Sequence, residues 1–124
     1  MTNMAKKIFI VEDEYDLMEF YIDALEISGY EVVGYAVNGA EAVEKFKKLV
    51  SLPDVIIMDH RMPIKSGIEA TREILGIDPN AKVIFASADK SVESEARSLG
   101  IASFKTKPFS LEKLLNNIEK IPAR

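Results

Sequence analysis

Acidic residues directly follow two short apolar runs in this chain of 124 residues. Residues 55–58 (Val-Ile-Ile-Met) lead into Asp59, and residues 8–11 (Ile-Phe-Ile-Val) lead into Glu12 and Asp13. Short, continuous apolar runs rich in β-branched residues are typical of strands buried on both faces of a sheet. Any one of these acids alone is explained as a solvated loop residue or a helix N-cap. Together they predict two buried strands whose carboxyl ends carry carboxylates.

Three carboxylates gathered at one place need a positive partner. At about 4 to 5 Å and an effective dielectric constant near 20, each pair repels by roughly 3 to 4 kcal/mol. The summed repulsion rivals the whole stability of a small domain, about 5 to 15 kcal/mol. An all-oxygen site with few carboxylates and room for water suits Mg²⁺ or Mn²⁺, and such an ion recruits phosphate.

Strands and helices are predicted to alternate along the chain, five of each. Strands are expected at residues 8–11, 31–37, 55–58, 82–86 and 101–105. Helices are expected at about 16–28, 40–49, 67–77, 91–99 and 111–121. This alternation predicts a parallel sheet covered on both faces by right-handed crossovers. In the flavodoxin-like strand order 2-1-3-4-5, chemistry gathers at the carboxyl ends of strands 1 and 3, which are the two that end in acids.

Polar residues just before the helices predict where the helices begin. Asp16 is expected to cap the first helix, with Glu19 three residues on as in a capping box. Ser66 is expected to open the third helix, and Ser91 and Ser110 to cap the fourth and the fifth.

Length and composition limit the class of protein. A chain of this length without a linker or repeat predicts a single domain over residues 1–124, with no output domain. The absence of cysteine excludes disulfides and thiolate metal sites. A net charge of −4 argues against a nucleic-acid-binding surface. The apolar run 8–11 is too short for a signal peptide or a membrane span, so we expect a cytoplasmic protein without membrane insertion.

Four short motifs together resemble those of response-regulator receiver domains, from one end of the chain to the other. They are Val11-Glu12-Asp13-Glu14, Met58-Asp59-His60-Arg61-Met62-Pro63, Ser87-Ala88 and Lys107-Pro108-Phe109. Each motif is weak alone, but their order and spacing over a chain of this length are specific. The resemblance, to the single-domain chemotaxis regulators in particular, implies a (βα)5 doubly wound sandwich with a five-stranded parallel sheet of order 2-1-3-4-5.

The resemblance implies a phosphorylation reaction. Asp59 would accept a phosphoryl group from a sensor histidine kinase or a histidine phosphotransfer protein. Asp13, Asp59 and the backbone carbonyl of Arg61 would bind Mg²⁺ or Mn²⁺, and Glu12 would act on the metal through water. Lys107 would contribute positive charge to the phosphoryl oxygens; an ordinary surface lysine is the alternative interpretation.

The resemblance also implies a switch and a docking surface. Ser87 stands where the family uses threonine or serine to bond a phosphoryl oxygen, and Phe104 stands at the family's aromatic switch position; a turn serine and a core phenylalanine are the alternatives. A downstream protein would dock on the face of the fourth helix, fifth strand and fifth helix, and the chain would be a monomer or a weak phosphorylation-dependent dimer. Arg61 and Asp89 would flank the mouth of the site and tune dephosphorylation, unless they form only an exposed ion pair.

Other classes of protein share this architecture. A flavodoxin-like electron carrier needs a Ser/Thr/Gly loop that binds a flavin phosphate, whereas residues 12–14 are all acidic and repel phosphate unless a cation intervenes. A metal-dependent phosphatase needs a second catalytic acid soon after the nucleophile, and residues 60–62 supply none. A fragment of a longer regulator, or a receiver that works unphosphorylated as a binding module, remains an alternative. His60 is given no role, because neighbours along a strand point to opposite sides.

Overall fold

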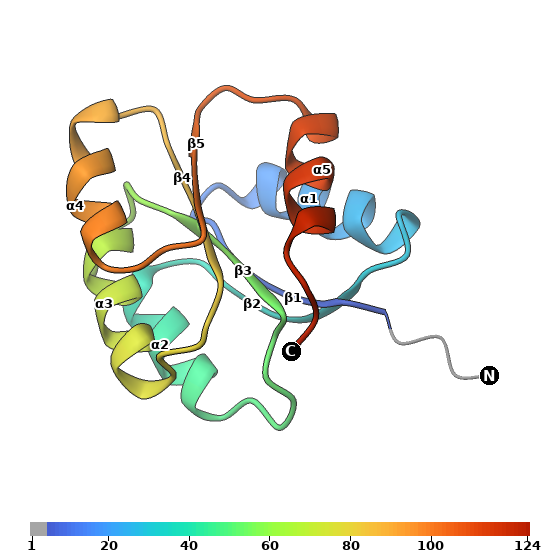
Figure 1. The fold of residues 1–124 in the computed structure, drawn as a ribbon, viewed down its shortest axis with the longest axis horizontal. Helices are drawn as coiled ribbons and strands as arrows, with labels where there is room; N and C mark the ends of the chain where they lie inside the picture. Colours follow the sequence, from blue (N-terminus) through green and yellow to red (C-terminus); the bar gives the residue numbers. More distant parts are fainter. Residues whose placement is uncertain (1–4) are drawn as a thin grey trace.

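A five-stranded parallel sheet forms the middle layer of the protein, as the computed structural model of residues 5–124 shows (Figure 1). The strands are β1 (Lys7–Val11), β2 (Glu31–Ala36), β3 (Val55–Asp59), β4 (Val83–Ser87) and β5 (Ser103–Thr106). The helices are α1 (Tyr15–Ile27), α2 (Gly39–Lys47), α3 (Gly67–Ile77), α4 (Glu93–Ser98) and α5 (Leu111–Lys120), and the 3₁₀ turn η1 (Lys90–Val92) precedes α4. The order β2-β1-β3-β4-β5 confirms the predicted fold class.

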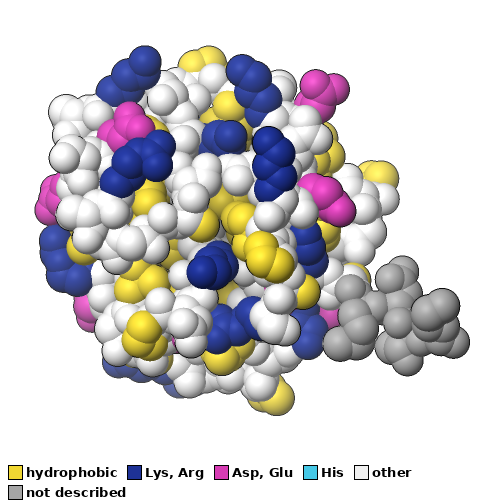
Figure 2. Space-filling view, viewed as in Figure 1, with side chains coloured by type: hydrophobic (Ala, Val, Ile, Leu, Met, Phe, Trp, Pro, Cys, Tyr) yellow, Lys and Arg dark blue, Asp and Glu magenta, His cyan; other side chains and the backbone are white. Residues whose placement is uncertain are grey.

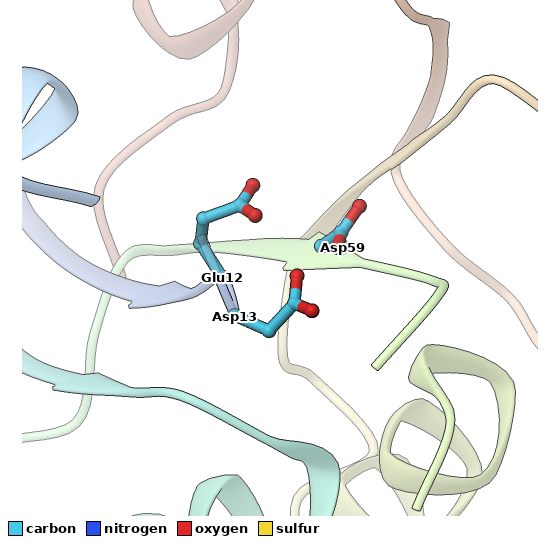
Figure 3. Close-up of side chains that lie close together, drawn as sticks. All are labelled: Glu12, Asp13 and Asp59. Carbon is cyan, nitrogen blue, oxygen red and sulfur yellow. The ribbon is translucent and has the colours of Figure 1, made fainter. Parts of the chain in front are cut away.

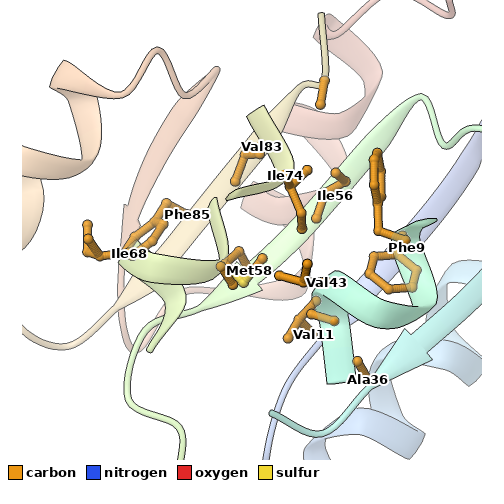
Figure 4. Packing of buried hydrophobic residues seen from close by; sticks show 14 of the residues in the cluster. Phe9, Val11, Ala36, Val43, Ile56, Met58, Ile68, Ile74, Val83 and Phe85 are labelled. Atoms are coloured by element: carbon orange, nitrogen blue, oxygen red, sulfur yellow. The ribbon is translucent and has the colours of Figure 1, made fainter. Parts of the chain in front are cut away.

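Helices cover both faces of the sheet, α1 and α5 on one side and α2, α3 and α4 on the other (Figure 1). Successive residues of a strand point to opposite faces. On β1, Ile8 and Ile10 therefore enter the core under α1 and α5. Phe9 and Val11 enter the core under the other three helices (Figure 4). Every residue of β3 and β4 is buried, which explains why both strands are continuous apolar runs.

The end of the loop after β3 lies against the backbone at the end of that strand. The Gly67 amide donates a hydrogen bond to the His60 carbonyl over 2.9 Å. A Cβ atom at Gly67 would lie 2.1 Å from the carbonyl oxygen of Asp59, so only glycine fits at the start of α3. Ser66 caps this helix in a capping box with Glu69, as predicted for its opening.

Two of the predicted helix caps are wrong. The first helix begins at Tyr15 and Asp16 lies in its first turn, because the Glu12 carboxylate accepts the Glu14 amide over 3.1 Å and turns the chain into the helix earlier. Ser91 is not a cap either, because its amide donates to the Asp89 carboxylate over 3.0 Å. At α4, a carboxylate is a better acceptor than the Ser91 hydroxyl, since it carries a full negative charge.

The predicted cap of the fifth helix is confirmed. The Ser110 hydroxyl accepts the Lys113 amide and caps α5.

Between residues 5 and 124, no helix combines the length and the apolar character needed to cross a membrane.

Candidate functional site

Three carboxylates converge beyond the ends of β1 and β3 (Figure 3). Val11 pairs with Met58 across the two parallel strands, so the residues that follow lie side by side. One carboxylate oxygen from each of Glu12, Asp13 and Asp59 lies within 4.8 Å of the other two. Glu12 and Asp59 are buried, whereas Asp13 is exposed. The structure thus assembles the acidic cluster from two strands that are more than forty residues apart in the sequence.

Lys107 follows β5, two strands from β3 in the sheet, and contacts two residues of this cluster. Its Nζ atom lies 2.9 Å from Asp59 Oδ1 and 3.1 Å from Glu12 Oε1. The Lys107 amide donates to the Ser87 carbonyl over 2.9 Å, which continues the pairing of β5 with β4 and directs the lysine toward β3. One ammonium group faces three carboxylates, so the cluster keeps surplus negative charge.

The protonation equilibria reflect this surplus charge. Burial raises the pKa of Asp59, and the hydrogen bond and charge of Lys107 only partly offset that rise. Burial also raises the pKa of Glu12, and the neighbouring charge of Asp59 adds to the effect. Burial alone would lower the pKa of Lys107, but its contacts with the two carboxylates outweigh burial and raise it. The charged forms of Glu12 and Asp59 are therefore incompletely stabilised by the protein alone, and a further cation would stabilise them.

A hollow of about 210 Å³ opens above the carboxylates. It is lined by Glu12, Asp13, Glu14, Asp59, Arg61, Ser87, Ala88 and Lys107. Glu14 was not predicted as a site residue, although it is the third acid in the run that follows β1. Its position directly after Glu12 and Asp13 is the sequence feature that could have indicated this.

Ser87 and Arg61 line the hollow, and Asp89 contacts both of them. The Ser87 hydroxyl is buried and accepts the Asp89 amide over 3.0 Å. The guanidinium of Arg61 lies 3.7 Å from the Asp89 carboxylate, and the Arg61 side chain is 79% exposed. The ion pair thus joins a residue that lines the hollow to one just outside its lining, and the roles of the three residues remain predictions.

An aromatic stack connects the end of β3 with β5. Phe104 is buried and stacks on Phe85, with ring centroids 5.8 Å apart and planes inclined by 17°. The His60 ring lies 5.7 Å from Phe85, and its buried Nδ1 atom has no hydrogen-bond partner. His60 does not line the hollow, which agrees with the prediction that it points away from the site.

The fold and this constellation define a response regulator receiver domain. The family model for that domain matches residues 8–119, and the chain belongs to this family. The chemotaxis protein CheY of Thermotoga maritima is 41% identical over 120 residues, which cover 95% of this chain and 98% of that protein. CheY of Bacillus subtilis is 40% identical over 119 residues, which cover 94% and 98% of the two chains.

Solved structures of related proteins share the fold. CheY in the CheX-CheY-BeF3-Mg²⁺ complex of Borrelia burgdorferi has a TM-score of 0.87 and 26% identity, over 94% of this chain and 88% of that chain. The response regulator TrrA of Thermotoga maritima, in complex with Mg²⁺-BeF, has a TM-score of 0.83 and 32% identity, over 94% and 99%. The chain is therefore a signalling protein of two-component systems, in which a receiver domain accepts a phosphoryl group on an aspartate.

Proposed function

We propose that Asp59 is the phosphoryl acceptor of this chain and that the donor is a phosphohistidine of a sensor histidine kinase or a histidine phosphotransfer protein. The observation that carries this proposal is the position of Asp59. It is buried at the carboxyl end of a central strand, 2.9 Å from Lys107 and within 4.8 Å of two further acids. No other residue of the cluster combines burial with a direct bond to the lysine and a place on β3.

The transfer requires positioning and charge neutralisation more than acid–base chemistry. An oxygen of Asp59 forms a bond to phosphorus while the bond between phosphorus and the donor histidine nitrogen breaks. The electron pair of the broken bond stays on that nitrogen. Lys107 already bonds the acceptor carboxylate, so its ammonium group is in place to stabilise the charge of the phosphoryl oxygens. A carboxylate is a competent nucleophile under these conditions.

The donor set of the site fits Mg²⁺ or Mn²⁺. All three cluster side chains offer oxygen, one of them is exposed, and a single lysine leaves their charge incompletely balanced. Asp13, Asp59 and the backbone carbonyl of Arg61 would hold the ion, and Glu12 would act through water. When bound, the ion neutralises the approaching phosphoryl oxygens. The chain then catalyses its own phosphorylation and dephosphorylation and acts on no separate substrate.

The signal leaves the site through β4 and β5. Ser87 would bond a phosphoryl oxygen in place of the Asp89 amide, and Phe104, already packed on Phe85, would take part in the switch by packing alone, since it has no hydroxyl. The protein would act in the cytoplasm as a monomer or a weak phosphorylation-dependent dimer.

The output surface would be the face formed by α4, β5 and α5. Lysines gather between β5 and α5, where Lys105, Lys113 and Lys120 line a shallow hollow. Figure 2 shows many basic side chains on the side of the molecule that includes this face. Opposite charges steer association, so a downstream protein with an acidic surface suits this face.

The experiment that tests the acceptor uses Mg²⁺ and acetyl phosphate, a small phosphodonor. A single acid-stable, base-labile phosphoryl adduct is expected on Asp59, located by mass spectrometry of peptides. Asp59→Asn should carry no adduct, and Asp16→Asn, which removes an exposed acid from the start of α1, should be phosphorylated like the wild type. Full phosphorylation of Asp59→Asn would overturn the assignment.

A further inference from the structure

Ile64 has an unusual backbone conformation. Among residues 5–124 it is the one non-glycine residue with positive φ, at 72°. Positive φ is rare for β-branched residues, because their Cβ substituents crowd the backbone. The Lys65 amide donates to the Pro63 carbonyl over 2.8 Å, so Ile64 is the centre of a three-residue turn. With positive φ at its centre, such a γ-turn is the rare and strained form.

The surrounding structure holds this turn in place. The base of the loop is closed by the bond between Gly67 and His60. On its outer side, the Gly39 amide donates to the Lys65 carbonyl over 3.1 Å, and a Cβ atom at Gly39 would lie 2.2 Å from that oxygen. Both contacts involve backbone atoms and leave no room for adjustment. The strain at Ile64 is therefore imposed by the loop and not relieved by it.

The side chain of Ile64 contributes no packing to the hydrophobic core. It is 82% exposed and belongs to neither hydrophobic core. Glycine or asparagine would adopt the same backbone conformation more easily. A strained residue that exposes a large apolar side chain indicates a use outside the chain, and strained residues cluster at functional sites.

The position of the loop indicates which partner uses it. The loop leads from β3 to α3, and the bond between Gly39 and Lys65 joins it to the start of α2, which follows β2. In the sheet β1 lies between β3 and β2. The loop therefore passes the carboxyl end of β1, where Asp13 is located. A protein that brings a phosphohistidine to Asp59 must cover this edge. The α4-β5-α5 face lies at the other edge of the sheet, where β5 is the last strand. A partner bound there has no need to reach Ile64.

We propose that Ile64 is a specificity-determining contact for the phosphohistidine protein that phosphorylates this chain, received by an apolar recess on that protein. The proposal rests on the acceptor role of Asp59. A few residues carry most of the binding energy of an interface, and an apolar side chain held in place by a strained turn is preorganised for such a contact.

The test compares Ile64→Asn and Ile64→Leu with Val50→Asn. Val50 is also β-branched and fully exposed, but it lies before β3, at the other end of the sheet. The protein donor is the autophosphorylated histidine kinase that transfers fastest to the wild type within a panel, and acetyl phosphate is the small donor. Asparagine removes the contact and relieves the turn, whereas leucine keeps an apolar side chain.

Ile64→Asn should lower kcat/KM for transfer from the kinase by about fivefold or more, chiefly through KM. Its melting temperature should rise by about 2 to 5 °C, because the strain is removed. Its phosphorylation by acetyl phosphate should be unchanged. Ile64→Leu and Val50→Asn should both transfer from the kinase at the wild-type rate.

Equal transfer from the kinase to the wild type and to Ile64→Asn would overturn the proposal. So would equal losses with the kinase and with acetyl phosphate, since those would show that the loop shapes the site itself. A wild type that acetyl phosphate does not phosphorylate on Asp59 would overturn the acceptor assignment instead. The small donor therefore distinguishes the two failures.

Discussion

Two buried aspartates at opposite ends of β3 have different electrostatic surroundings. Asp54, just before the strand, accepts the Lys7 amide over 2.7 Å and the Arg124 amide over 2.8 Å. Asp59, at the end of the strand, faces a lysine and two other carboxylates. Asp54 is 8% exposed and Asp59 is 7% exposed, so burial does not distinguish them. The difference lies in what surrounds the charge.

Fixed backbone donors satisfy Asp54, and its bonds join three segments that are distant in the sequence. Nearby, the Arg124 guanidinium holds the Asp78 carboxylate at 2.6 and 3.1 Å, and this hydrogen-bonded pair lowers the pKa of Asp78. At the other end of the sheet, burial and the charge of Asp13 raise the pKa of Asp59. A satisfied buried charge stabilises the fold, and an incompletely satisfied one is available for chemistry.

The largest expected effect is the loss of phosphorylation in Asp59→Asn. The substitution removes the nucleophile and also one of three clustered negative charges. We therefore expect no phosphoryl adduct and, without metal, an unfolding free energy at neutral pH that is about 1 kcal/mol higher than that of the wild type. Urea denaturation in a chelating buffer measures the second effect. A marked loss of stability would mean that the bond to Lys107 outweighs the repulsion.

Asp54→Ala should lower the stability of the protein and leave its phosphorylation intact. Two buried backbone amides lose their acceptor, so the unfolding free energy should fall by about 2 to 4 kcal/mol. Phosphorylation by acetyl phosphate should persist at a temperature where the variant is folded, because Asp54 lies at the far end of β3. Unchanged stability in urea would show that water replaces the carboxylate and that the contrast between the two aspartates is smaller than the contacts indicate.

Removing an exposed acid should separate metal binding from the acceptor chemistry. Asp13→Ala deletes a proposed ligand of the ion and leaves Asp59 and Lys107 in place. We expect Mg²⁺ affinity, measured by titration, to fall by about tenfold or more, and phosphorylation at limiting Mg²⁺ to slow in parallel. Asp16→Ala is the matched control, since it also removes one exposed acid from this side. An equal loss of affinity in both variants would indicate a general field effect.

The two ends of the sheet should respond to pH with opposite signs. The pKa of Asp59 is raised on folding, so its protonation favours the folded state at low pH, and this contribution disappears as the pH rises through the folded pKa. The pKa of Asp78 is lowered on folding, so its contribution is present above the ordinary value of 3.8 and disappears as the pH falls. Differences between wild type and Asp59→Asn, and between wild type and Asp78→Asn, should therefore slope in opposite directions in urea denaturation. Parallel slopes would contradict the assignment.

Local sequence patterns predicted the acidic end of the sheet well and the opposite end poorly. Asp13 and Asp59 follow apolar runs, so their placement needs only the strand pattern and the parallel order. Asp54 could not be predicted, because one of its two donors comes from a residue seventy positions away. The cis peptide bond at Lys107-Pro108 likewise depends on tertiary context, which a short motif does not contain.

The same limit explains the misplaced caps and the missed turn. Asp16 and Ser91 have the right residue types, but carboxylates elsewhere in the loops take the amides that lead into both helices. At Ile64 the residue type argues against the observed conformation, since a β-branched residue predicts negative φ. The conformation depends on tertiary contacts of the loop, such as the close approach of Gly39 to Lys65, which no local pattern contains.

The smallest expected effect concerns the ion pair at the mouth of the site. Arg61 lines the hollow, and its exposed guanidinium lies 3.7 Å from the Asp89 carboxylate. We expect this pair to hinder the approach of water to phosphorylated Asp59, and Arg61→Ala to open the approach and free Asp89 to orient a water molecule. We expect autodephosphorylation of Arg61→Ala to be several-fold faster, a barrier change of roughly 1 kcal/mol.

A double-variant cycle isolates the contribution of the pair. Decay of the phosphorylated protein is followed in wild type, Arg61→Ala, Asp89→Ala and the double variant. If shielding by the pair is the cause, the two single variants decay faster and the double variant falls short of the product of their effects, because either substitution alone already breaks the pair. Slower decay in Arg61→Ala would show instead that the guanidinium swings inward to stabilise the phosphoryl oxygens. Four identical decay curves would reduce the pair to an exposed contact, and the contrast between the two ends of β3 would then rest on the carboxylates and Lys107 alone.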